Sequence, residues 1–548
     1  MLDPELLTNI HWGAELLEEV ISHNGSILLV VDSDMDGFTS AAIMYQYIKD
    51  INSEVNIDYV LHDGKQHGLS DHISQLINSE THYDLVLLPD SSSNDYVYHE
   101  QLKEIGTRVL VLDHHLTDVE LSDNAIVINN QLSPEYSNKE LTGAGVAYQF
   151  CRYFDKFYNC NYANKYIDLA AAGIVGDMGA VTELENRYII KEGLNKLNNK
   201  MLWALARKQA YSITGKMGAG DSDIIASLNP ISVAFYIVPL VNATIRVGTQ
   251  QEKERLFLGF IDGDKLVPSN KRGAKGELEK VSVESARECG NIRNRQNKLL
   301  DEAMFSMEVK ISNNNLLDNK ILFCRLEEDD DFPSELNGLL AMKLSSKYKK
   351  PTIVARLGAD GKNKGSIRGL NQSELSSFKD FLTESTFFEY IMGHDNAAGC
   401  CIEDKYLTKF HMWANEQLKN MDFGENCYDV NFERIGADAD IAELIIDIGE
   451  NKDLWGQGLS EPYIHVSDIN ITFNDVQIMG TNKDTVKIIK NGIAYMKFKA
   501  NDFIEELKKY NEIKLEVIGR ANINYWGGNV TPQIFIEDYE VSDDTLGF

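Results

Sequence analysis

The sequence predicts an α/β protein with a parallel β-sheet in its N-terminal part and a small β-barrel at its C-terminus. Over the first ~200 residues, short apolar runs alternate with helical patterns, which is typical of a parallel sheet. From about Ile464, strand-like segments such as 469–473 and 534–536 alternate with turns, which favours a β-barrel. A chain of 548 residues is long enough for about three or four domains.

Composition places the chain among ordinary globular proteins, with 43% hydrophobic and 25% charged residues. No apolar stretch approaches the ~18 residues that span a bilayer, and residues 1–19 lack a basic region followed by an apolar core. We therefore expect a cytoplasmic protein without membrane association. The seven cysteines form no C-x-x-C pair and indicate reduced structural thiols rather than a zinc site. The net charge of -31 does not exclude a nucleic-acid partner, because an acidic exterior can coexist with a local basic groove.

Three aspartates, Asp32, Asp34 and Asp36, directly follow the apolar run 27–31. This run is expected to be a buried strand, and a helix is expected over residues 37–49. Carboxylates this close together repel one another and would take up protons unless a cation held them ionised. The triplet therefore predicts a site for divalent cations at the carboxyl end of a strand, where open α/β sheets bind ligands. The alternative is an Asp-rich turn in which one aspartate caps the helix.

Three later apolar segments also carry candidate ligands. Residues 85–89 run into Asp90, residues 109–112 run into the sequence Asp113-His114-His115, and segment 167–178 contains Asp177. Imidazole is a common metal ligand, and a neighbouring carboxylate fixes its tautomer, so this sequence favours a metal site. Considered singly, Asp90 also fits a turn, Asp177 a helix cap and the histidine pair a structural role.

The ordered set of Asp-x-Asp-x-Asp-Gly at 32–37, Asp90, Asp-His-His at 113–115 and Gly-x-x-x-Asp ending at Asp177 resembles the four motifs of the DHH phosphoesterase superfamily. That superfamily includes RecJ exonucleases, nanoRNases, cyclic dinucleotide phosphodiesterases and type II inorganic pyrophosphatases. Segments 239–248, 365–369 and 393–399 resemble motifs of RecJ and of the DHH-associated domain. Segments 456–462 and 519–538 resemble the flanks of the RecJ OB domain, so the resemblance covers almost the whole chain and favours RecJ.

The resemblance implies a division of the chain into four regions. These are a DHH catalytic domain at 1–215, a helical connecting region at 216–310, a smaller α/β DHH-associated substrate-binding domain at 311–425, across a cleft from the first, and an OB-like nucleic-acid-binding domain at 426–548.

The resemblance also implies two divalent cations. Oxygen ligands with one imidazole suit Mn²⁺, with Mg²⁺ as the second choice. Asp90 would bridge the two ions, Asp32 and Asp34 would hold one, and Asp36, His114 and Asp177 would surround the other. Asp113 would orient the histidines, and His115 would contact the scissile phosphate. The expected substrate-binding residues are Arg246, Asn242, Ser366, Arg368, His394 and Lys65.

Several positions depart from the family pattern. Many DHH proteins have a histidine four residues before the middle aspartate of the first motif, where this chain has Val30, which leaves the role of Asp32 open. Family residues are also replaced at Leu240, Ile245, Gly369 and Met392, so substrate contacts are expected to differ. Loop 63–69 falls where the family has a basic loop. One expectation is that Lys65 or His67 of this loop contacts phosphate; the alternative is that the loop is simply exposed.

By resemblance to RecJ, we expect a metal-dependent exonuclease that degrades single-stranded DNA from 5' to 3' into mononucleotides in recombination, repair or replication. A helicase or a single-strand-binding protein is an expected partner, and the protein is expected to be a monomer. One alternative is a nanoRNase or cyclic dinucleotide phosphodiesterase on short substrates, against which the OB-like tail argues. Another is an inactive replication scaffold like Cdc45, against which the complete set of core ligands argues.

Overall fold

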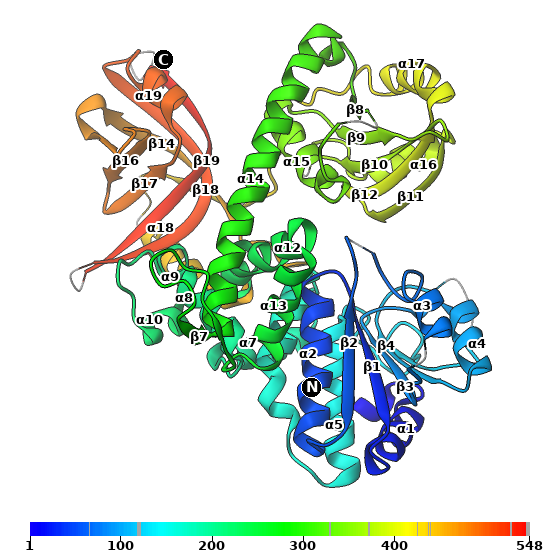
Figure 1. Ribbon diagram of the computed structural model, residues 1–548. Helices are drawn as coiled ribbons and strands as arrows, with labels where there is room; N and C mark the ends of the chain where they lie inside the picture. The colour runs from blue at the N-terminus through cyan, green and yellow to red at the C-terminus, as the bar shows by residue number, and fades with distance from the viewer. Residues whose placement is uncertain are drawn as a thin grey trace. The chain divides into compact units, whose positions relative to one another are not determined.

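The computed structural model describes residues 1–543 except 65, 80, 118–121, 328–329, 371–372, 425, 437, 439 and 527–528. The chain divides into two compact units, Met1–Asn426 and Cys427–Phe548. The first unit contains a parallel sheet, a series of helices and a mixed sheet, and the second contains a seven-stranded sheet (Figure 1). The predicted α/β class with a β-rich C-terminal part is thereby confirmed.

The first sheet is parallel and has the strand order β2-β1-β3-β4-β5. Its strands are β1 (Ser26–Val31), β2 (Asn56–Leu61), β3 (Leu85–Pro89), β4 (Arg108–Asp113) and β5 (Ile126–Asn129). The apolar runs at 27–31, 85–89 and 109–112 therefore form the three central strands, as their continuous hydrophobicity predicts. Strand order reverses between β1 and β3, and this reversal is where open α/β sheets bind ligands.

Helices cover both faces of this sheet. Helices α1 (Ile10–Ser22), α2 (Met35–Ile51) and α5 (Gly143–Tyr158) lie on one face, and α3 (Ile73–Asn78) and α4 (Tyr96–Glu104) lie on the other (Figure 1). Helix α2 begins before the predicted residue because Asp34 caps it, accepting a hydrogen bond from Gly37 N at 3.0 Å. Helix α6 (Ile167–Gly176) packs on α2 and α5, and its alanines and Gly173 permit a close approach.

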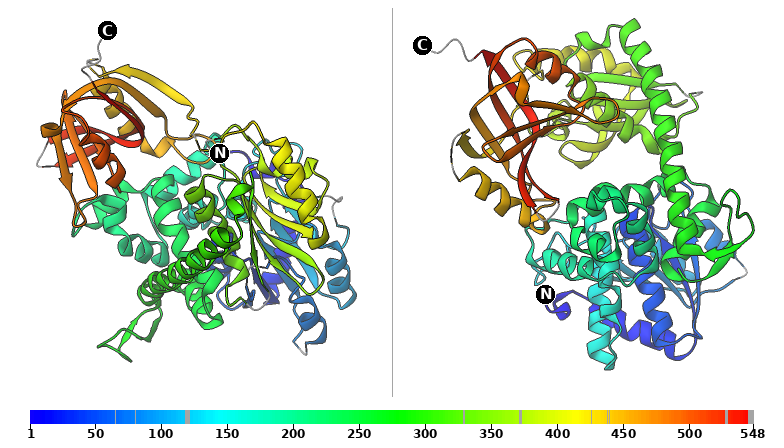
Figure 2. Two further views of the ribbon diagram at one scale, coloured as in Figure 1. Left: turned by 90° about the horizontal axis from the view of Figure 1, so that it is seen from above. Right: turned by 90° about the vertical axis from the view of Figure 1, so that its left-hand side faces the viewer.

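A series of helices follows the first sheet. They are α7 (Leu184–Asn195), α8 (Lys200–Lys208), α9 (Ala210–Thr214), α10 (Asp221–Ser227), α12 (Val238–Val247) and α13 (Gln250–Ile261). Helix α14 (Val281–Asn313) is 33 residues long and contacts α8, α12 and α13 along one part and α15 (Asn337–Tyr348) along another. It is one unbroken helix in the right-hand view of Figure 2. Helix α14 begins inside the helical connecting region expected at 216–310 and ends just beyond it, at Asn313.

The second sheet is mixed and has the order β11-β12-β10-β9-β8. Its strands are β8 (Leu322–Leu326), β9 (Thr352–Leu357), β10 (Lys362–Arg368), β11 (Phe388–His394) and β12 (Ala397–Glu403). Helices α15, α16 (Phe378–Glu384) and α17 (Leu407–Gln417) accompany it, and α15 packs on β9 and β10. Only β8 and β9 are paired in parallel; the other pairs are antiparallel.

The second unit has a sheet of order β13-β14-β18-β19-β17-β16-β15. Its strands are β13 (Val430–Ile435), β14 (Tyr463–Thr472), β15 (Val476–Met479), β16 (Thr485–Lys490), β17 (Ile493–Lys497), β18 (Glu512–Trp526) and β19 (Asn529–Asp543). Helix α18 (Ile441–Glu450) packs against β18 and β19, and α19 (Asn501–Leu507) also contributes side chains to the unit's own hydrophobic core.

One stretch of the described chain is long and apolar enough to cross a membrane, which the sequence pattern did not predict. It is Pro230–Val247, with a mean hydropathy of 1.5, and 56% of it is buried inside the protein. Such burial is what a helix in the core of a folded unit shows, and the stretch also carries Asn242 and Arg246.

Candidate metal centre

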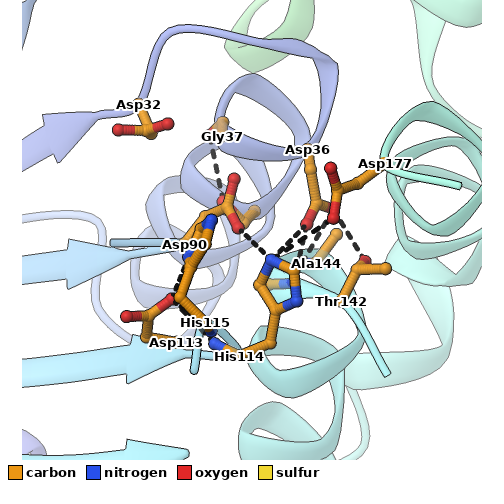
Figure 3. A network of polar contacts seen from close by, with 12 residues as sticks. Asp32, Asp36, Gly37, Asp90, Asp113, His114, His115, Thr142, Ala144 and Asp177 are labelled. Carbon is orange, nitrogen blue, oxygen red and sulfur yellow. Dashed lines mark hydrogen bonds and ion pairs between the residues drawn. The ribbon is translucent and has the colours of Figure 1, made fainter. Parts of the chain in front are cut away.

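The switch point of the first sheet gathers acidic residues from several elements. Parallel strands all end at the same edge of a sheet, so the segments after β1, β3 and β4 meet there. Three sets of described side chains each have ligand atoms within 4.8 Å of one another. One set is Asp90, Asp113, His114 and His115. The other two hold the six residues expected to bind metal: Asp32, Asp34 and Asp90 in one set, and Asp36, His114 and Asp177 in the other. We refer to these six residues as the candidate ligands; Figure 3 labels all of them except Asp34.

Asp36 is held by the N-terminus of α5. Its carboxylate accepts hydrogen bonds from Thr142 Oγ1 at 2.9 Å, Gly143 N at 2.7 Å and Ala144 N at 3.0 Å. A helix N-terminus favours negative charge, so these contacts fix the orientation of a side chain that is completely buried. Gly173 is required beside it, because a Cβ at that position would lie 2.4 Å from Asp36 Oδ1.

Asp90 occupies a strained turn directly after β3. Its φ of 69° is positive, as is that of Ser92 at 78°, and strain of this kind is often found at functional sites. The backbone N of Asp90 donates to Leu112 O at 2.8 Å, which ties the turn to the end of β4. A Cβ at Gly143 would lie 2.3 Å from Asp90 Oδ1, so a glycine is needed where α5 starts.

His114 lies between the two sets of candidate ligands. Its Nε2 is 3.2 Å from Asp90 Oδ1, 3.4 Å from Asp177 Oδ2 and 3.9 Å from Asp36 Oδ2. Figure 3 shows the imidazole with Asp90 on one side and Asp36 and Asp177 on the other. Burial lowers the pKa of His114 and the adjacent His115 lowers it further, so the ring is neutral and available as a ligand.

His115 points to the same site and is bound to Asp113. Asp113 Oδ1 accepts from His115 Nδ1 at 2.8 Å and from the backbone N of both histidines, at 2.7 Å and 3.2 Å. Burial alone would lower the pKa of His115, but the hydrogen bond and charge of Asp113 raise it to about 10. Burial alone would raise the pKa of Asp113, but His115 and His114 bring it below its ordinary value. His115 is thus a half-exposed cation beside the candidate ligands.

Three of the candidate ligands, Asp36, Asp90 and Asp177, have raised pKa values, so binding of a cation would displace protons from them. Burial raises the pKa of Asp36 and Asp90, and in Asp90 the neighbouring Asp36 adds to the effect. Burial, followed by the charges of Asp36 and Asp34, raises the pKa of Asp177 to about 8. Several buried carboxyl groups that disfavour their own charge at pH 7 need a positive partner to ionise together.

The candidate ligands fit a divalent cation on a second ground. Within the described residues, Asp32 Oδ1, Asp90 Oδ1 and His114 Nε2 are buried atoms that make no hydrogen bond; the last two lie 3.2 Å apart but not in hydrogen-bonding geometry. Buried polar atoms without partners are costly, and here three of them meet in one acidic site. Carboxylate oxygens with one imidazole nitrogen are ligands suited to Mn²⁺ or Mg²⁺.

The structure also shows where the predicted substrate residues lie. Arg368 and His394 end β10 and β11, and both are in register with Ala397 of β12, so they lie at the same end of the second sheet. Ser366 shares a face of β10 with Arg368. His394 is exposed, whereas Ser366 and Arg368 are partly buried.

Two further predicted residues lie on α12. Asn242 is partly buried, and within the described residues its Oδ1 has no hydrogen-bond partner. Burial lowers the pKa of Arg246; the charge of Asp34 opposes this effect and that of Arg293 adds to it. Burial also lowers the pKa of Arg368, with Arg246 contributing, so these two arginines are close enough for their charges to interact. Lys65 lies outside the described residues.

Sequence reasoning missed several residues near the site. Thr142, Gly143 and Ala144 hold Asp36, and the only signal for them was a Thr-Gly-Ala-Gly segment before an apolar helix. Arg293 of α14 was also missed. The contact of His67 with Asp32 was also missed: His67 was expected at phosphate or in an exposed loop, and it is an exposed residue whose Nδ1 lies 2.6 Å from Asp32 Oδ2.

Comparison with known proteins agrees with the geometry. The family model "DHH family, N-terminal domain" matches residues 26–174, and "RecJ OB domain" matches residues 438–538. The SPbeta prophage-derived protein YorK of Bacillus subtilis, named for single-strand DNA-specific exonuclease activity, is 36% identical over 98% of this chain and 91% of its own length. The single-stranded-DNA-specific exonuclease RecJ of Bacillus subtilis is 26% identical over 99% of this chain and 64% of its own length.

The fold is shared with a solved structure. The crystal structure of RecJ from Thermus thermophilus in complex with Mn²⁺ matches with a TM-score of 0.71 at 19% identity, covering 97% of this chain and 72% of that one. Fold and site together define a DHH-type phosphoesterase with a divalent-cation centre. Within that class, the chain belongs to the RecJ-like family of exonucleases.

Proposed function

We propose that the protein is a single-strand-specific DNA exonuclease that uses two divalent cations, Mn²⁺ in preference to Mg²⁺. The observation that carries the proposal is the pair of ligand sets at one switch point, in a chain that is 36% identical to YorK over nearly its whole length. RecJ of Thermus thermophilus was solved in complex with Mn²⁺ and also in complex with Mg²⁺, which supports a divalent cation. The preference for Mn²⁺ rests on the imidazole among the oxygen ligands.

The protein's own residues divide the work of hydrolysis. Asp32, Asp34 and Asp90 would hold one cation, and Asp36, His114 and Asp177 the other. Bound divalent cations supply an activated water and neutralise charge that develops on the phosphate. His115, kept protonated by Asp113, faces the scissile phosphate and donates a hydrogen bond to it. Arg246, Arg368, Ser366 and His394 grip the flanking phosphates and set the position of the strand.

The polarity and the setting are part of the same proposal. We infer that the protein degrades single-stranded DNA from 5' to 3' and releases mononucleotides. We also infer that it is a monomer and is located in the cytoplasm. Single-stranded DNA is the substrate, which a helicase or single-strand-binding protein supplies during repair, recombination or replication. The OB domain match at residues 438–538 supports a nucleic-acid substrate longer than a dinucleotide.

One digestion experiment tests the proposal. Single-stranded DNA labelled at either end is incubated with the purified protein and Mn²⁺, and products are followed over time. We expect the 5' label to appear as mononucleotide from the outset, and EDTA to stop the reaction. Early release of the 3' label would overturn the polarity. Cleavage confined to di- and trinucleotides would favour the short-substrate enzymes, and DNA binding without any cleavage would favour a scaffold.

A further inference from the structure

Asp32 is held by a histidine from a different segment of the chain. His67 Nδ1 lies 2.6 Å from Asp32 Oδ2, a distance typical of a hydrogen bond from an imidazole to a carboxylate. The two residues follow β1 and β2, which are neighbouring parallel strands with Val31 opposite Leu61. The His67 side chain is 49% exposed, whereas that of Asp32 is 1% exposed. A surface loop therefore reaches one of the most buried candidate ligands.

The backbone beside His67 is fixed from its other side. Leu69 N donates to Asp95 Oδ2 at 2.9 Å, just before α4 begins. Gly68 has a φ of +70°, and a Cβ there would lie 2.4 Å from the same oxygen. Only glycine lets the loop pass this close to Asp95 without displacement. The position of the imidazole thus depends on Gly68 and Asp95 as well as on Asp32.

The contact with His67 leaves one oxygen of Asp32 for a ligand. Asp32 Oδ1 is buried and has no hydrogen-bond partner within the described residues. Asp32 also belongs to the set that it forms with Asp34 and Asp90. Carboxylates that bind metals are themselves held by hydrogen bonds from outer groups, and an imidazole that holds one oxygen while the other remains available fits that arrangement.

We propose that His67 is a positioning residue that orients Asp32 toward the cation shared with Asp34 and Asp90. The inference rests on the proposed function, because it concerns the same metal centre. The inference also gives Asp32 a defined role. Val30, which stands where many DHH proteins have a histidine, is a fully buried residue of the hydrophobic core, so in this chain the histidine beside Asp32 comes from another segment. His67 acts through Asp32 and is not itself one of the candidate ligands.

Calorimetry on the metal-free full-length protein tests the inference without relying on activity. Mn²⁺ is titrated into the wild type, His67→Ala, Asp32→Asn and the double variant. Loss of a group that orients a metal ligand typically weakens metal binding by about 10–100-fold, so we expect His67→Ala to weaken one of two Mn²⁺ sites by that factor. In the Asp32→Asn background, His67→Ala should cause no further loss, because the two residues act as one unit.

Two further variants serve as controls for the role of His67. His82→Ala removes an exposed histidine from the segment between α3 and β3, and it should leave Mn²⁺ affinity unchanged. Gly68→Ala should weaken the same site as His67→Ala by displacing the loop, and the thermal unfolding midpoint of each variant reports whether the fold is intact. The inference would be overturned, and the proposed function left standing, by either of two results. One is wild-type Mn²⁺ affinity in His67→Ala; the other is that His67→Ala lowers Mn²⁺ affinity equally in the wild type and in Asp32→Asn. Failure of the wild type to bind Mn²⁺ would overturn the proposed function and the inference with it.

Discussion

Asp36 is subject to opposing electrostatic demands. Three hydrogen bonds from the start of α5 favour its ionised form, whereas burial raises its pKa. Burial also raises the pKa of its neighbour Asp90, and the charges of nearby carboxyl groups, Asp36 first, add to the effect. A divalent cation resolves the conflict for both residues, since it replaces the protons that burial would otherwise bring in.

Proton release should therefore accompany Mn²⁺ binding. Asp177 has a pKa of about 8 in the metal-free protein, so at pH 7 it is largely protonated and must lose its proton to act as a ligand. Lowering the pH from 8 to 6 raises proton competition, and apparent affinity should fall by about tenfold per pH unit for each proton released. Calorimetry in buffers of different ionisation enthalpy measures the number of protons released when Mn²⁺ binds. Affinity that does not change between pH 6 and 8 would contradict the expectation.

Asp90 should be the least replaceable ligand. It belongs both to the set with Asp32 and Asp34 and to the set with Asp113, His114 and His115, and its Oδ1 lies 3.2 Å from His114 Nε2, so Asp90→Asn removes charge from both. We expect a loss of nuclease activity beyond the ~100-fold typical of residues that only orient a ligand. Rates on labelled single-stranded DNA at saturating Mn²⁺ check this. Asp95→Asn should cost no more than about 100-fold, because Asp95 holds the backbone beside His67 and is not one of the candidate ligands.

At the scale of elements, the junction of α5 with the sheet requires a particular residue. Gly143→Ala would place a Cβ 2.3 Å from Asp90 Oδ1 and next to the amides that hold Asp36. We expect a loss of about 1–3 kcal/mol in the free energy of unfolding, as for other overpacked sites, and weaker Mn²⁺ binding. Chemical denaturation and calorimetry measure the two effects.

Gly290→Ala in the middle of α14 provides the matched comparison. A Cβ there would meet the Lys208 side chain at 2.9 Å, close to its flexible end, which can move aside. Alanine is the better helix former by about 1 kcal/mol, so this variant should be as stable as the wild type or more stable, with unchanged Mn²⁺ affinity. Equal destabilisation by the two substitutions would show that the close approach at Asp90 has no special role.

On the scale of the whole molecule, each compact unit has a hydrophobic core of its own. The core of the second unit includes Ile464, Val517 and Ile534, and every residue of that cluster follows position 440. Three clusters of the described first unit consist of residues up to Phe423. Each unit therefore has a described core built from its own residues, which is the apolar burial that independent folding needs.

A chain ending at Asn426 should therefore fold and keep its metal centre. We expect cooperative unfolding and wild-type Mn²⁺ affinity, because all candidate ligands precede that residue. Binding of long single-stranded DNA should weaken at least about tenfold, since each stacked base that is lost costs about 1–3 kcal/mol. Calorimetry and fluorescence anisotropy with labelled DNA measure these properties. Undiminished DNA affinity would show that the OB-like unit is not a binding surface.

Much of the fold follows from local patterns. The runs at 27–31, 85–89 and 109–112 became β1, β3 and β4 because strands buried on both faces need continuous apolar sequence. Segment 167–178 is rich in small apolar residues, which do not by themselves distinguish a helix from a strand. Its residues Ile167–Gly176 form helix α6, which packs against α2 and α5. The apolar stretch Pro230–Val247 was overlooked because proline, asparagine and arginine interrupt its hydrophobic character.

The sequence by itself determined which side chains are chemically suited to hold cations, because carboxylates gathered at strand ends stay ionised together only beside a positive charge. It also placed the triplet behind β1, where Asp34 caps α2 as well as belonging to a ligand set. Only the tertiary structure decided what surrounds those side chains. Thr142 lies 106 positions from Asp36 and His67 lies 35 positions from Asp32, yet each fixes its partner. Such contacts arise from strand order and helix packing, which no local pattern encodes.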